Sequence, residues 1–574
     1  MPDETRKKKR LGCFKIVLCF FLAIALLIVV WLPFNLGPVP VPGQALVEVS
    51  KETTRITEPL DENGDVDFLE AINLRCSQGV TLENNSFVKL IQASGPLPNS
   101  QTISDAVTQR LGIAPVPEKG HYLLSFKSWV EQEVNRINSQ RDAQRAAEID
   151  QIMEVDSESD ATGNSELKLP EPPKRLTAHD YDLQQLDFAS QYPWSAKELP
   201  QVEQWRKANE APLKIARKGI ARSEYYYPLV SDRFPKMLNA NLGYTKAFSD
   251  IGKCLQVSSM NRLHQEDVDG CIQDIKALHR LGIHVSRGPT MIEELVSHKL
   301  INEAMDSLVS LCASEKASLN QLKALFQWIK EFEIPADLGQ RVELDRYVGL
   351  DATISMARAR NFETEEVEGY LGMYSRIIDW PTVLEQLNTD YDRFVEVGEI
   401  KDATECASAW SALQKDMVAN QNWVTDNGMK SALMGRKSKG IWVGRLLSGI
   451  LMPDVKIAAD SENGIKAKRD ILGLIIAAAM FKTENSRYPN SIDELLPQYL
   501  SEKPINPFTG QPFVYRLTES GIQIQPQEKS DHSSSLRQND RLTVLVEQHT
   551  WKTFRQEQDE SDSIRPKRLG QTPD

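Results

Sequence analysis

Two carboxylates lie close together in the stretch QRVELDRYVGLD at residues 340–351. Glu343 and Asp345 are two positions apart, and a pair of carboxylates can act as general acid and general base in a hydrolase. The same stretch alternates acidic with basic residues, which is typical of an exposed helix face with ion pairs; a buried Glu–Arg pair between helices is a further alternative. Glu343 and Asp345 are therefore the candidate catalytic residues, although the sequence assigns no reaction to them.

A second group of titratable residues, within a stretch of 35 positions, would suit metal binding or general-base work. Its members are His264, Glu266, Asp267, His279, His284, Glu294 and His298. Glu294 and His298 are four positions apart and share one helix face, as two metal ligands would. His279 and His284 are five apart and diverge on a helix, and the pattern HExxH does not occur. We therefore predict a solvated helix face with hydrogen bonds between residues four apart, and neither a metal site nor a cofactor.

The stretch MKSALMGRKSKGIWVGR at residues 429–445 is a local basic island. Its basic residues are Lys430, Arg436, Lys437, Lys439 and Arg445. Gly435 and Gly440 have the separation of a phosphate-binding loop, but Ile441 stands where that loop requires Lys, so no such loop is predicted. Contact with anionic lipid headgroups or with an acidic partner is the functional interpretation that this island leaves open.

Aromatic residues gather in two loop-like contexts, SEYYYPLV at 223–230 and QYPWS at 191–195. Such residues can form a recognition surface, and they can equally pack in the core of a helical layer. The chain contains no G-x-S-x-G, no Walker motif and no dinucleotide-binding fingerprint. The motifs therefore favour a protein without a catalytic function.

The N-terminus predicts a membrane anchor. The basic cluster RKKKR at residues 6–10 precedes IVLCFFLAIALLIVVWLPF at 16–34, which contains no charge. About 20 apolar residues cross a bilayer as a helix, so 16–34 is predicted to be an uncleaved, single-pass signal anchor, with cleavage as the alternative. By the positive-inside rule, residues 1–15 stay in the cytoplasm. The body is then exported across the inner membrane into a periplasm-like space.

The exported body is strongly acidic. The whole chain has a net charge of −13, and the first fifteen residues carry six basic and two acidic side chains, which leaves −17 for the remainder. Nucleic-acid binding requires a basic face that displaces counterions, so nucleic acid is excluded as a partner class.

Five cysteines follow the predicted anchor: Cys76, Cys254, Cys271, Cys312 and Cys406. An odd number without a C-x-x-C pair indicates neither a disulfide framework nor a zinc site. Free, buried thiols are predicted, because Cys is among the most buried residue types. A Cys254–Cys271 bridge is the alternative in an oxidising compartment.

Composition divides the exported body into segments. Residues 46–153 form a membrane-proximal α-rich segment, and residues 154–176 are acidic, Ser-rich and predicted to be a disordered linker. Residues 180–460 show one amphipathic helical pattern after another, with short polar breaks. Such a pattern predicts helical hairpins stacked as an α-solenoid-like layer or a bundle, and the fold class is therefore mainly α.

Two helix starts within this domain carry capping boxes, Thr290 with Glu293 and Ser318 with Gln321. After Thr290, the apolar residues Ile292, Leu295 and Val296 predict the buried stripe of the next helix. After Ser318, the corresponding stripe consists of Leu322, Leu325, Phe326 and Ile329.

The pattern changes in residues 467–525. The run ILGLIIAAAMF at 471–481 is apolar all round but too short to span a bilayer, so it predicts a buried core helix. RYPNSIDELLPQYL follows, with a third capping box at Ser491 and Glu494. Pro507 and Gly510 in NPFTGQPFVYR then predict a turn into a hairpin over that helix. Its facing residues are Phe513, Tyr515, Ile522 and Ile524.

The order of these motifs, a helix, RYP, LLPQYL and NPFTGQPF, resembles the C-terminal part of type II secretion pseudopilins. The resemblance implies a small α+β domain in which a long helix packs on an antiparallel sheet. Residues 526–574 form a polar tail, predicted to be mostly disordered, with one candidate strand at 541–548.

A broader resemblance rests on ETTRITEPLDENGDVDFLEAIN, GCIQDIKALHRLGIHVSRGPTMIEELV and IDWPTVLEQLNTDYDRF. These blocks are similar to a family of membrane-anchored planctomycete proteins to which no activity is assigned. We expect a non-catalytic scaffold or protein-binding module in the cell envelope, with protein partners on the helical domain. The alternatives are an envelope hydrolase that uses Glu343 and Asp345, and an accessory subunit of a secretion or pilus-like system.

Overall fold

The computed structural model describes residues 46–97, 101–158, 172, 174–178, 181, 184–335, 338–358, 375–400, 402–433, 435–451, 455–508, 510–519, 521–525 and 544–546. The predicted anchor at 16–34 lies outside the described residues, as do most of the predicted linker and most of the predicted tail. Among the helices that are described, none has the length and apolar character needed to cross a membrane.

The fold is mainly α-helical, as predicted. Its helices are α2 Phe68–Cys76, α3 Ser86–Ser94, α4 Gln101–Leu111, α5 Phe126–Glu158, α6 Gln184–Gln191, α7 Pro200–Ala208, α8 Glu210–Ile220, α9 Tyr244–His264, α10 Val268–Ser286, α11 Met291–Ala313, α12 Leu319–Lys330, α13 Leu338–Ala357, α15 Trp380–Gly398, α16 Ala403–Leu433, α17 Arg436–Leu451, α18 Val455–Asn485 and the 3-10 helix η2 Ile492–Leu495. The strands are β1 Val514–Leu517, β2 Ile522–Gln525 and β3 Val544–Val546.

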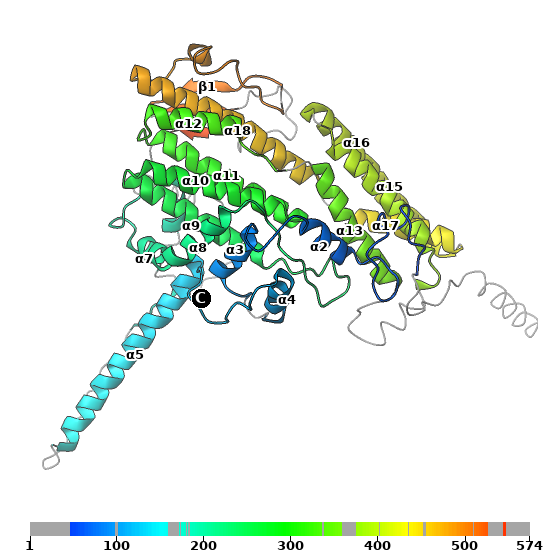
Figure 1. Cartoon of the computed structure of the whole chain (residues 1–574), viewed down its shortest axis with the longest axis horizontal. Helices are drawn as coiled ribbons and strands as arrows, with labels where there is room; N and C mark the ends of the chain where they lie inside the picture. Colours follow the sequence, from blue (N-terminus) through cyan, green and yellow to red (C-terminus); the bar gives the residue numbers. More distant parts are fainter. Residues whose placement is uncertain are drawn as a thin grey trace, which may run out of the picture.

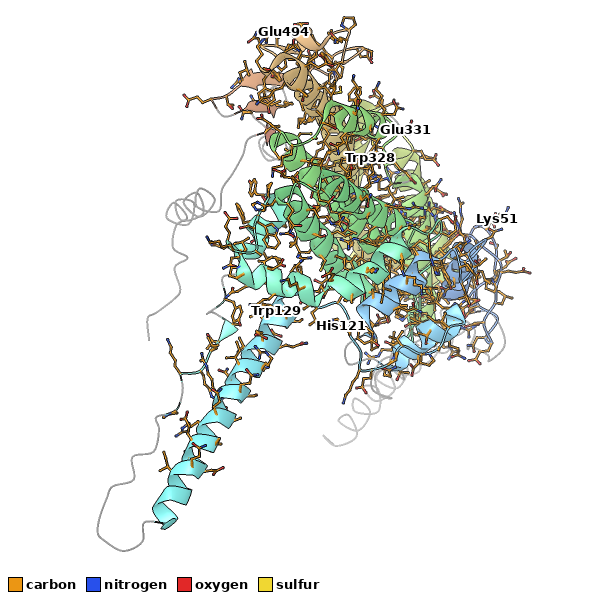
Figure 2. All side chains as sticks on the ribbon, turned by 60° about the vertical axis from the view of Figure 1, so that its left-hand side comes forward. Lys51, His121, Trp129, Trp328, Glu331 and Glu494 are labelled. Atoms are coloured by element: carbon orange, nitrogen blue, oxygen red, sulfur yellow. The ribbon has the colours of Figure 1, made fainter. Side chains whose placement is uncertain are left out.

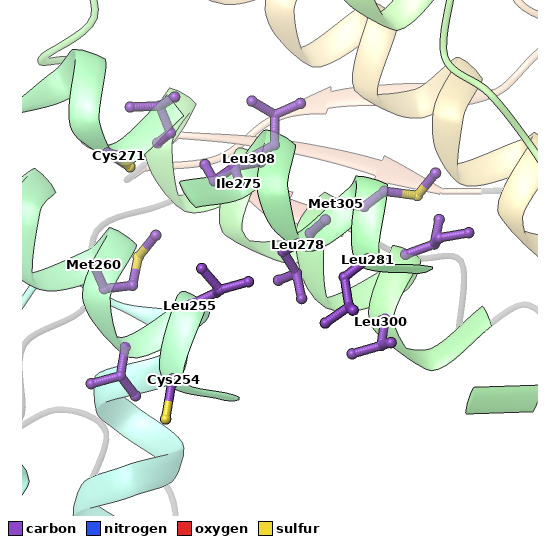
Figure 3. Packing of buried hydrophobic residues seen from close by; sticks show 14 of the residues in the cluster. Cys254, Leu255, Met260, Cys271, Ile275, Leu278, Leu281, Leu300, Met305 and Leu308 are labelled. Atoms are coloured by element: carbon purple, nitrogen blue, oxygen red, sulfur yellow. The ribbon is translucent and has the colours of Figure 1, made fainter. Parts of the chain in front are cut away.

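Helices α9, α10 and α11 are joined by short loops and pack side by side at the centre of the molecule (Figure 1). Both capping boxes predicted in this region are confirmed, Thr290 with Glu293 at the start of α11 and Ser318 with Gln321 at the start of α12. Figure 3 shows Leu255, Leu278 and Leu300, one from each central helix, in their shared core, where all three are almost fully buried.

Helix α18 lies along α11 and α12 and carries the apolar run 471–481 into the same core. The three strands form an antiparallel sheet in the order β1-β2-β3, and β3 falls inside the candidate strand at 541–548. Gly510 has φ +67°, a conformation that glycine adopts readily, and it lies in the turn before the hairpin. Phe513, Ile522 and Ile524 are buried in the α18 core, which confirms the predicted hairpin.

The third predicted capping box is wrong. Ser491 precedes a short 3-10 helix, and its side chain makes no capping hydrogen bond. The Glu494 carboxylate instead accepts hydrogen bonds from the backbone and side-chain amides of Asn490 and from the Arg487 guanidinium. The residue types fit the motif, but the nearer partners engage the carboxylate.

A second hydrophobic core lies on the other side of the molecule. Its principal residues come from α13, α15, α16 and α17, and they enclose part of α2. Val383, Leu384 and Leu387 of α15 are 0% exposed and stand at its centre. This core is distinct from the one around α9–α11 and α18, so the chain buries its apolar residues in two clusters.

Helix α5 projects from the body as an arm (Figures 1 and 2). Its base is fixed by Phe126, Trp129 and Val130, which are buried, and by Trp205, whose indole N–H donates to the Leu124 carbonyl at 2.8 Å. From residue 131 to residue 153, the described side chains are all exposed or half-buried. We call residues 131–158 the α5 arm.

Candidate functional site

In the first two turns of α11, the buried face of the helix is opposite to the predicted one. Glu293, Glu294 and His298 face inwards and are at most 3% exposed, whereas Ile292 is 54% and Leu295 is 42% exposed. The prediction that Ile292 and Leu295 lie in the buried stripe is therefore wrong, and so is the predicted solvated face around Glu294 and His298. Burying carboxylates is costly unless they are paired, so the groups around them decide what this site is.

Arg341 of α13 supplies the positive charge. Its Nε lies 3.1 Å from Oε2 of Glu294, and the two side chains are 6% and 4% exposed. The Arg341 guanidinium also donates to the Gly288 carbonyl, just before α11. A Cβ at Gly288 would stand 2.0 Å from Oε1 of Glu293, so only glycine lets this loop approach the carboxylate. Arg341 therefore ties the start of α13 to the start of α11.

His298 connects the same site to α18. Its Nδ1 is hydrogen-bonded to the Ser461 hydroxyl at 2.9 Å, and its Nε2 lies 2.8 Å from Oε1 of Glu294. We refer to Glu293, Glu294, His298, Arg341 and Ser461 as the buried charge cluster. It joins α11, α13 and α18.

Glu293 is the most enclosed member of the cluster. Its carboxylate accepts hydrogen bonds from the Thr290 backbone N–H at 3.1 Å and from the Thr290 hydroxyl at 2.9 Å. Burial raises the pKa of Glu293 to about 7, against the opposing effects of Thr290 and of the Arg341 charge. Its other oxygen and the nearby Tyr225 hydroxyl are buried without a hydrogen-bond partner among the described residues.

The order Ser461, His298, Glu294 has the elements of a nucleophile, a base and an orienting acid. The geometry does not favour that role. His298 is 3% exposed, and its contact with Glu294 lacks hydrogen-bond alignment, as does the contact of Arg341 with Glu294. Ser461 is a half-buried residue of α18, and its hydroxyl is engaged by the buried His298 ring. The arrangement suits a structural junction between three helices.

The structure separates the roles of the two predicted carboxylates. Glu343 pairs through Oε1 with Arg55 Nε and through Oε2 with Arg346 Nη2, each at 2.8 Å. The Glu343–Arg346 pair lies within α13, and Glu343 is 22% exposed. The buried Glu–Arg pair between helices, the alternative for this stretch, is Arg341 with Glu294 of α11. Burial raises the pKa of Asp345 to about 7, and its carboxylate has no ion-pair partner in the described part of the chain. The catalytic role of Asp345 stays a prediction.

The other histidines of the titratable group lie apart. His279 and His284 are buried, and their Nε2 atoms are within hydrogen-bond distance of the carbonyl oxygens of Glu333 and Ile220. Burial lowers the pKa of both to about 4, so both are neutral at pH 7. In the described ranges, no set of three or more His, Cys, Asp or Glu residues is placed to hold a metal ion.

The basic island does not form one patch. Lys439 is buried. The Arg436 guanidinium donates to the Ile378 carbonyl and lies 3.8 Å from the Asp379 carboxylate. Lys430 and Lys437 are exposed. The Arg445 guanidinium lies over the Trp423 ring. Contact of this segment with anionic headgroups or an acidic partner stays a prediction.

The aromatic and cysteine residues belong to the cores. Tyr225, Tyr227 and Trp194 are each at most 4% exposed, which confirms the core-packing interpretation of the two aromatic stretches. The five cysteines after the predicted anchor are free thiols, so Cys254 and Cys271 do not form the alternative bridge. Burial raises their pKa values, which makes these thiols poor nucleophiles.

Comparisons with known proteins assign the chain to no family. No family model, curated protein or solved structure matches it. Its function is therefore inferred from the arrangement of its own residues.

Sequence patterns missed two members of the buried charge cluster. Arg341 and Ser461 are 43 and 163 positions from His298, and neither lies in a motif that points to α11. One local signal could have indicated this site. Ile292 and Leu295 flank Glu293 and Glu294, so an apolar and an acidic face of the helix are alternatives for burial.

Proposed function

We propose that this protein is a membrane-anchored envelope scaffold that binds a protein partner, without catalysing a reaction. The observation that carries the proposal is the inverted start of α11. Ile292 and Leu295 are three positions apart on one helix face, and both are largely exposed. We call this pair the α11 contact face.

Burial by a partner would stabilise both side chains. Transferring a Leu or Ile side chain from water to an apolar interface contributes about 1.5–3 kcal/mol. The buried charge cluster behind the α11 contact face holds α11 against α13 and α18, so the face is presented on a rigid support. A rigid surface loses little conformational entropy on binding, which favours affinity.

The α5 arm offers a second surface. Its described side chains are exposed or half-buried, and Asn138 exchanges two hydrogen bonds with the backbone of Leu176, in a segment that returns along it. A helix with few buried contacts gains stability when a partner covers one side of it. The arm therefore extends the reach of the scaffold.

The location of the scaffold follows from the predicted anchor at 16–34, which would place the body on the exported side of the inner membrane. The likeness of residues 467–525 to pseudopilin domains supports a secretion or pilus-like machine as the setting of the partner. The planctomycete family resemblance is compatible with the envelope location and with a secretion or pilus-like machine. The hydrolase alternative depends on Asp345 alone, because Glu343 is held by two arginines.

The test is cross-linking in intact producing cells, followed by purification of the tagged full-length chain and mass spectrometry. We expect one or two proteins near stoichiometry with the wild type and their loss from the Ile292→Asp, Leu295→Asp double variant. Val418→Asp is the matched control, because Val418 is also an exposed apolar residue of a helix, at 53%. Recovery of the chain alone, or equal recovery of partners by all three proteins, would contradict the proposal.

A further inference from the structure

We propose that a pocket between α15, α16 and α17 binds a small zwitterion of the amino-acid or dipeptide class. This inference is independent of the proposed scaffold function, because none of the pocket residues belongs to α11 or to the α5 arm. The pocket has a volume of about 420 Å³, within the range of about 300–1,000 Å³ that is typical of small-molecule sites.

The pocket contains a cation that no carboxylate of the described residues neutralises. The Arg445 guanidinium lies 4.1 Å from the centre of the Trp423 ring, which holds it in a cation–π contact. Within the described ranges, Arg445 has no carboxylate partner. A guanidinium held over an aromatic ring keeps N–H groups with which a ligand carboxylate can form two parallel hydrogen bonds.

The pocket also contains a carboxylate that no cation of the described residues engages. Asp390 accepts hydrogen bonds from the Ser448 hydroxyl at 2.6 Å and from the Gln386 amide at 3.1 Å, and both donors are neutral. Ser448 is three positions after Arg445 on α17, so the two charged groups approach the pocket from neighbouring points. The Ser448 and Gln386 contacts fix the orientation of the carboxylate.

A second charged pair in the same pocket makes the contrast clear. Arg393 and Asp416 also line it, but they form an ion pair with each other between α15 and α16, and both are exposed. Arg445 and Asp390 therefore differ from these neighbours, because neither has a partner of opposite charge in the part of the chain that the structure describes. The lining also includes three apolar side chains, Phe394, Leu413 and Met417.

These three features define the ligand. A ligand carboxylate would pair with Arg445, and a ligand ammonium group would pair with Asp390. An apolar ligand side chain would pack against Phe394, Leu413 and Met417. A phosphate ester would meet the negative charges of Asp390 and Asp416, and a purely apolar ligand would leave both ions desolvated without partners. An amino acid or a dipeptide with an apolar side chain satisfies all three requirements.

The experiment uses the purified full-length chain and two panels of probes, the twenty free L-amino acids and a set of dipeptides built from apolar residues. Thermal shift selects binders, and calorimetry measures Kd. We expect at least one probe with an apolar side chain to bind, and its N-acetyl and C-terminal amide derivatives to bind at least about tenfold more weakly, or about 1.4 kcal/mol. The panel that contains the tighter binders distinguishes a free amino acid from a peptide.

Variants locate the binding site. Arg445→Gln and Asp390→Asn are each expected to weaken binding by about tenfold or more, and Arg445→Lys to retain part of it. Lys437→Gln is the control, because Lys437 is an exposed base of the same helix that does not line the pocket. Far-ultraviolet circular dichroism establishes that each variant is folded. The absence of any binder in both panels, or unchanged affinity in folded Arg445→Gln, would overturn the proposal.

Discussion

The position of a charge relative to solvent decides its contribution to stability, and two arginines of this chain allow the comparison. Arg341 and its partner Glu294 are 6% and 4% exposed, whereas Arg393 and its partner Asp416 are 44% and 62% exposed. Removing one member of a buried pair leaves the other charge desolvated and uncompensated. Removing one member of an exposed pair leaves a charge that water solvates.

We therefore expect Arg341→Gln to lower the free energy of unfolding by about 3–5 kcal/mol at pH 7. Arg393→Gln, the matched control, should lower it by about 1 kcal/mol or less. Urea unfolding followed by circular dichroism measures both. Equal losses in the two variants would mean that water reaches the buried charge cluster.

Glu293 gives this cluster a pH dependence. Burial raises its pKa from an ordinary value of 4.5 to about 7, so the folded chain binds this proton more tightly than the unfolded chain does. Below pH 4.5 both the folded and the unfolded chain hold this proton, so ionisation of Glu293 costs no stability. As the pH rises from 4.5 towards 7, only the unfolded chain releases the proton, and the free energy of unfolding falls. The full effect is on the order of 3 kcal/mol.

Glu293→Gln should remove this contribution, because the amide oxygen still accepts from Thr290 and carries no charge. We expect the variant to gain about 3 kcal/mol of stability relative to the wild type between pH 5 and pH 8. Unfolding of both proteins in urea at half-unit pH intervals measures the difference. A constant difference across this range would show that Glu293 is ionised in the folded chain at pH 5.

At the scale of single helices, α11 and α12 use the same capping device in different surroundings. Thr290 caps α11 through Glu293, which is fully buried, and Ser318 caps α12 through Gln321, in a contact exposed to solvent. Loss of an exposed cap costs about 1 kcal/mol. Loss of the buried cap also removes one of the two donors to the Glu293 carboxylate, which water does not replace.

Thr290→Ala is therefore expected to cost about 2 kcal/mol or more, and Ser318→Ala about 1 kcal/mol. Thermal and urea unfolding of the two single variants provide the measurement. Both substitutions remove a capping hydroxyl, and Thr290→Ala also removes the Thr methyl group. A larger loss for Ser318→Ala than for Thr290→Ala would contradict the burial argument.

Helices of this kind were predictable where their signals are local. The caps of α11 and α12, the stripe Leu322, Leu325 and Ile329, and the turn at Gly510 depend on neighbours within a few positions, and the structure has them. The face of α11 was not predictable in this way. Its orientation depends on Arg341 and Ser461, which are distant in sequence and whose proximity only the packed structure creates.

The candidate site shows the same limit. The stretch 340–351 marked Glu343 and Asp345 as equivalent carboxylates, because spacing alone cannot separate an ion-paired side chain from a buried, unpaired one. The pocket between α15, α16 and α17 carried even less signal. Its charged residues come from three helices, and of these only Arg445 lay in a stretch with an unusual composition.

At the scale of the whole molecule, the two hydrophobic clusters meet at a charged junction. One cluster contains α9, α10, α11 and most of α18, and the other contains α13, α15 and parts of α16 and α17. The buried charge cluster connects α11 and α18 of the first with α13 of the second. Cys76 and Leu242 also pack against both clusters. Two cores that share so few residues are expected to open as separate cooperative units.

Leu387→Ala tests this expectation, because Leu387 is 0% exposed at the centre of the second cluster. The cavity should cost about 2–5 kcal/mol, and the loss should fall on the unit that contains it. Hydrogen exchange followed by mass spectrometry should show reduced protection in α13, α15 and α17, with α9 and α10 unchanged. Leu278→Ala, at the centre of the first cluster, should give the reverse pattern. If either variant lowers protection equally across both clusters, the junction transmits unfolding, and the chain behaves as one cooperative unit despite its two cores.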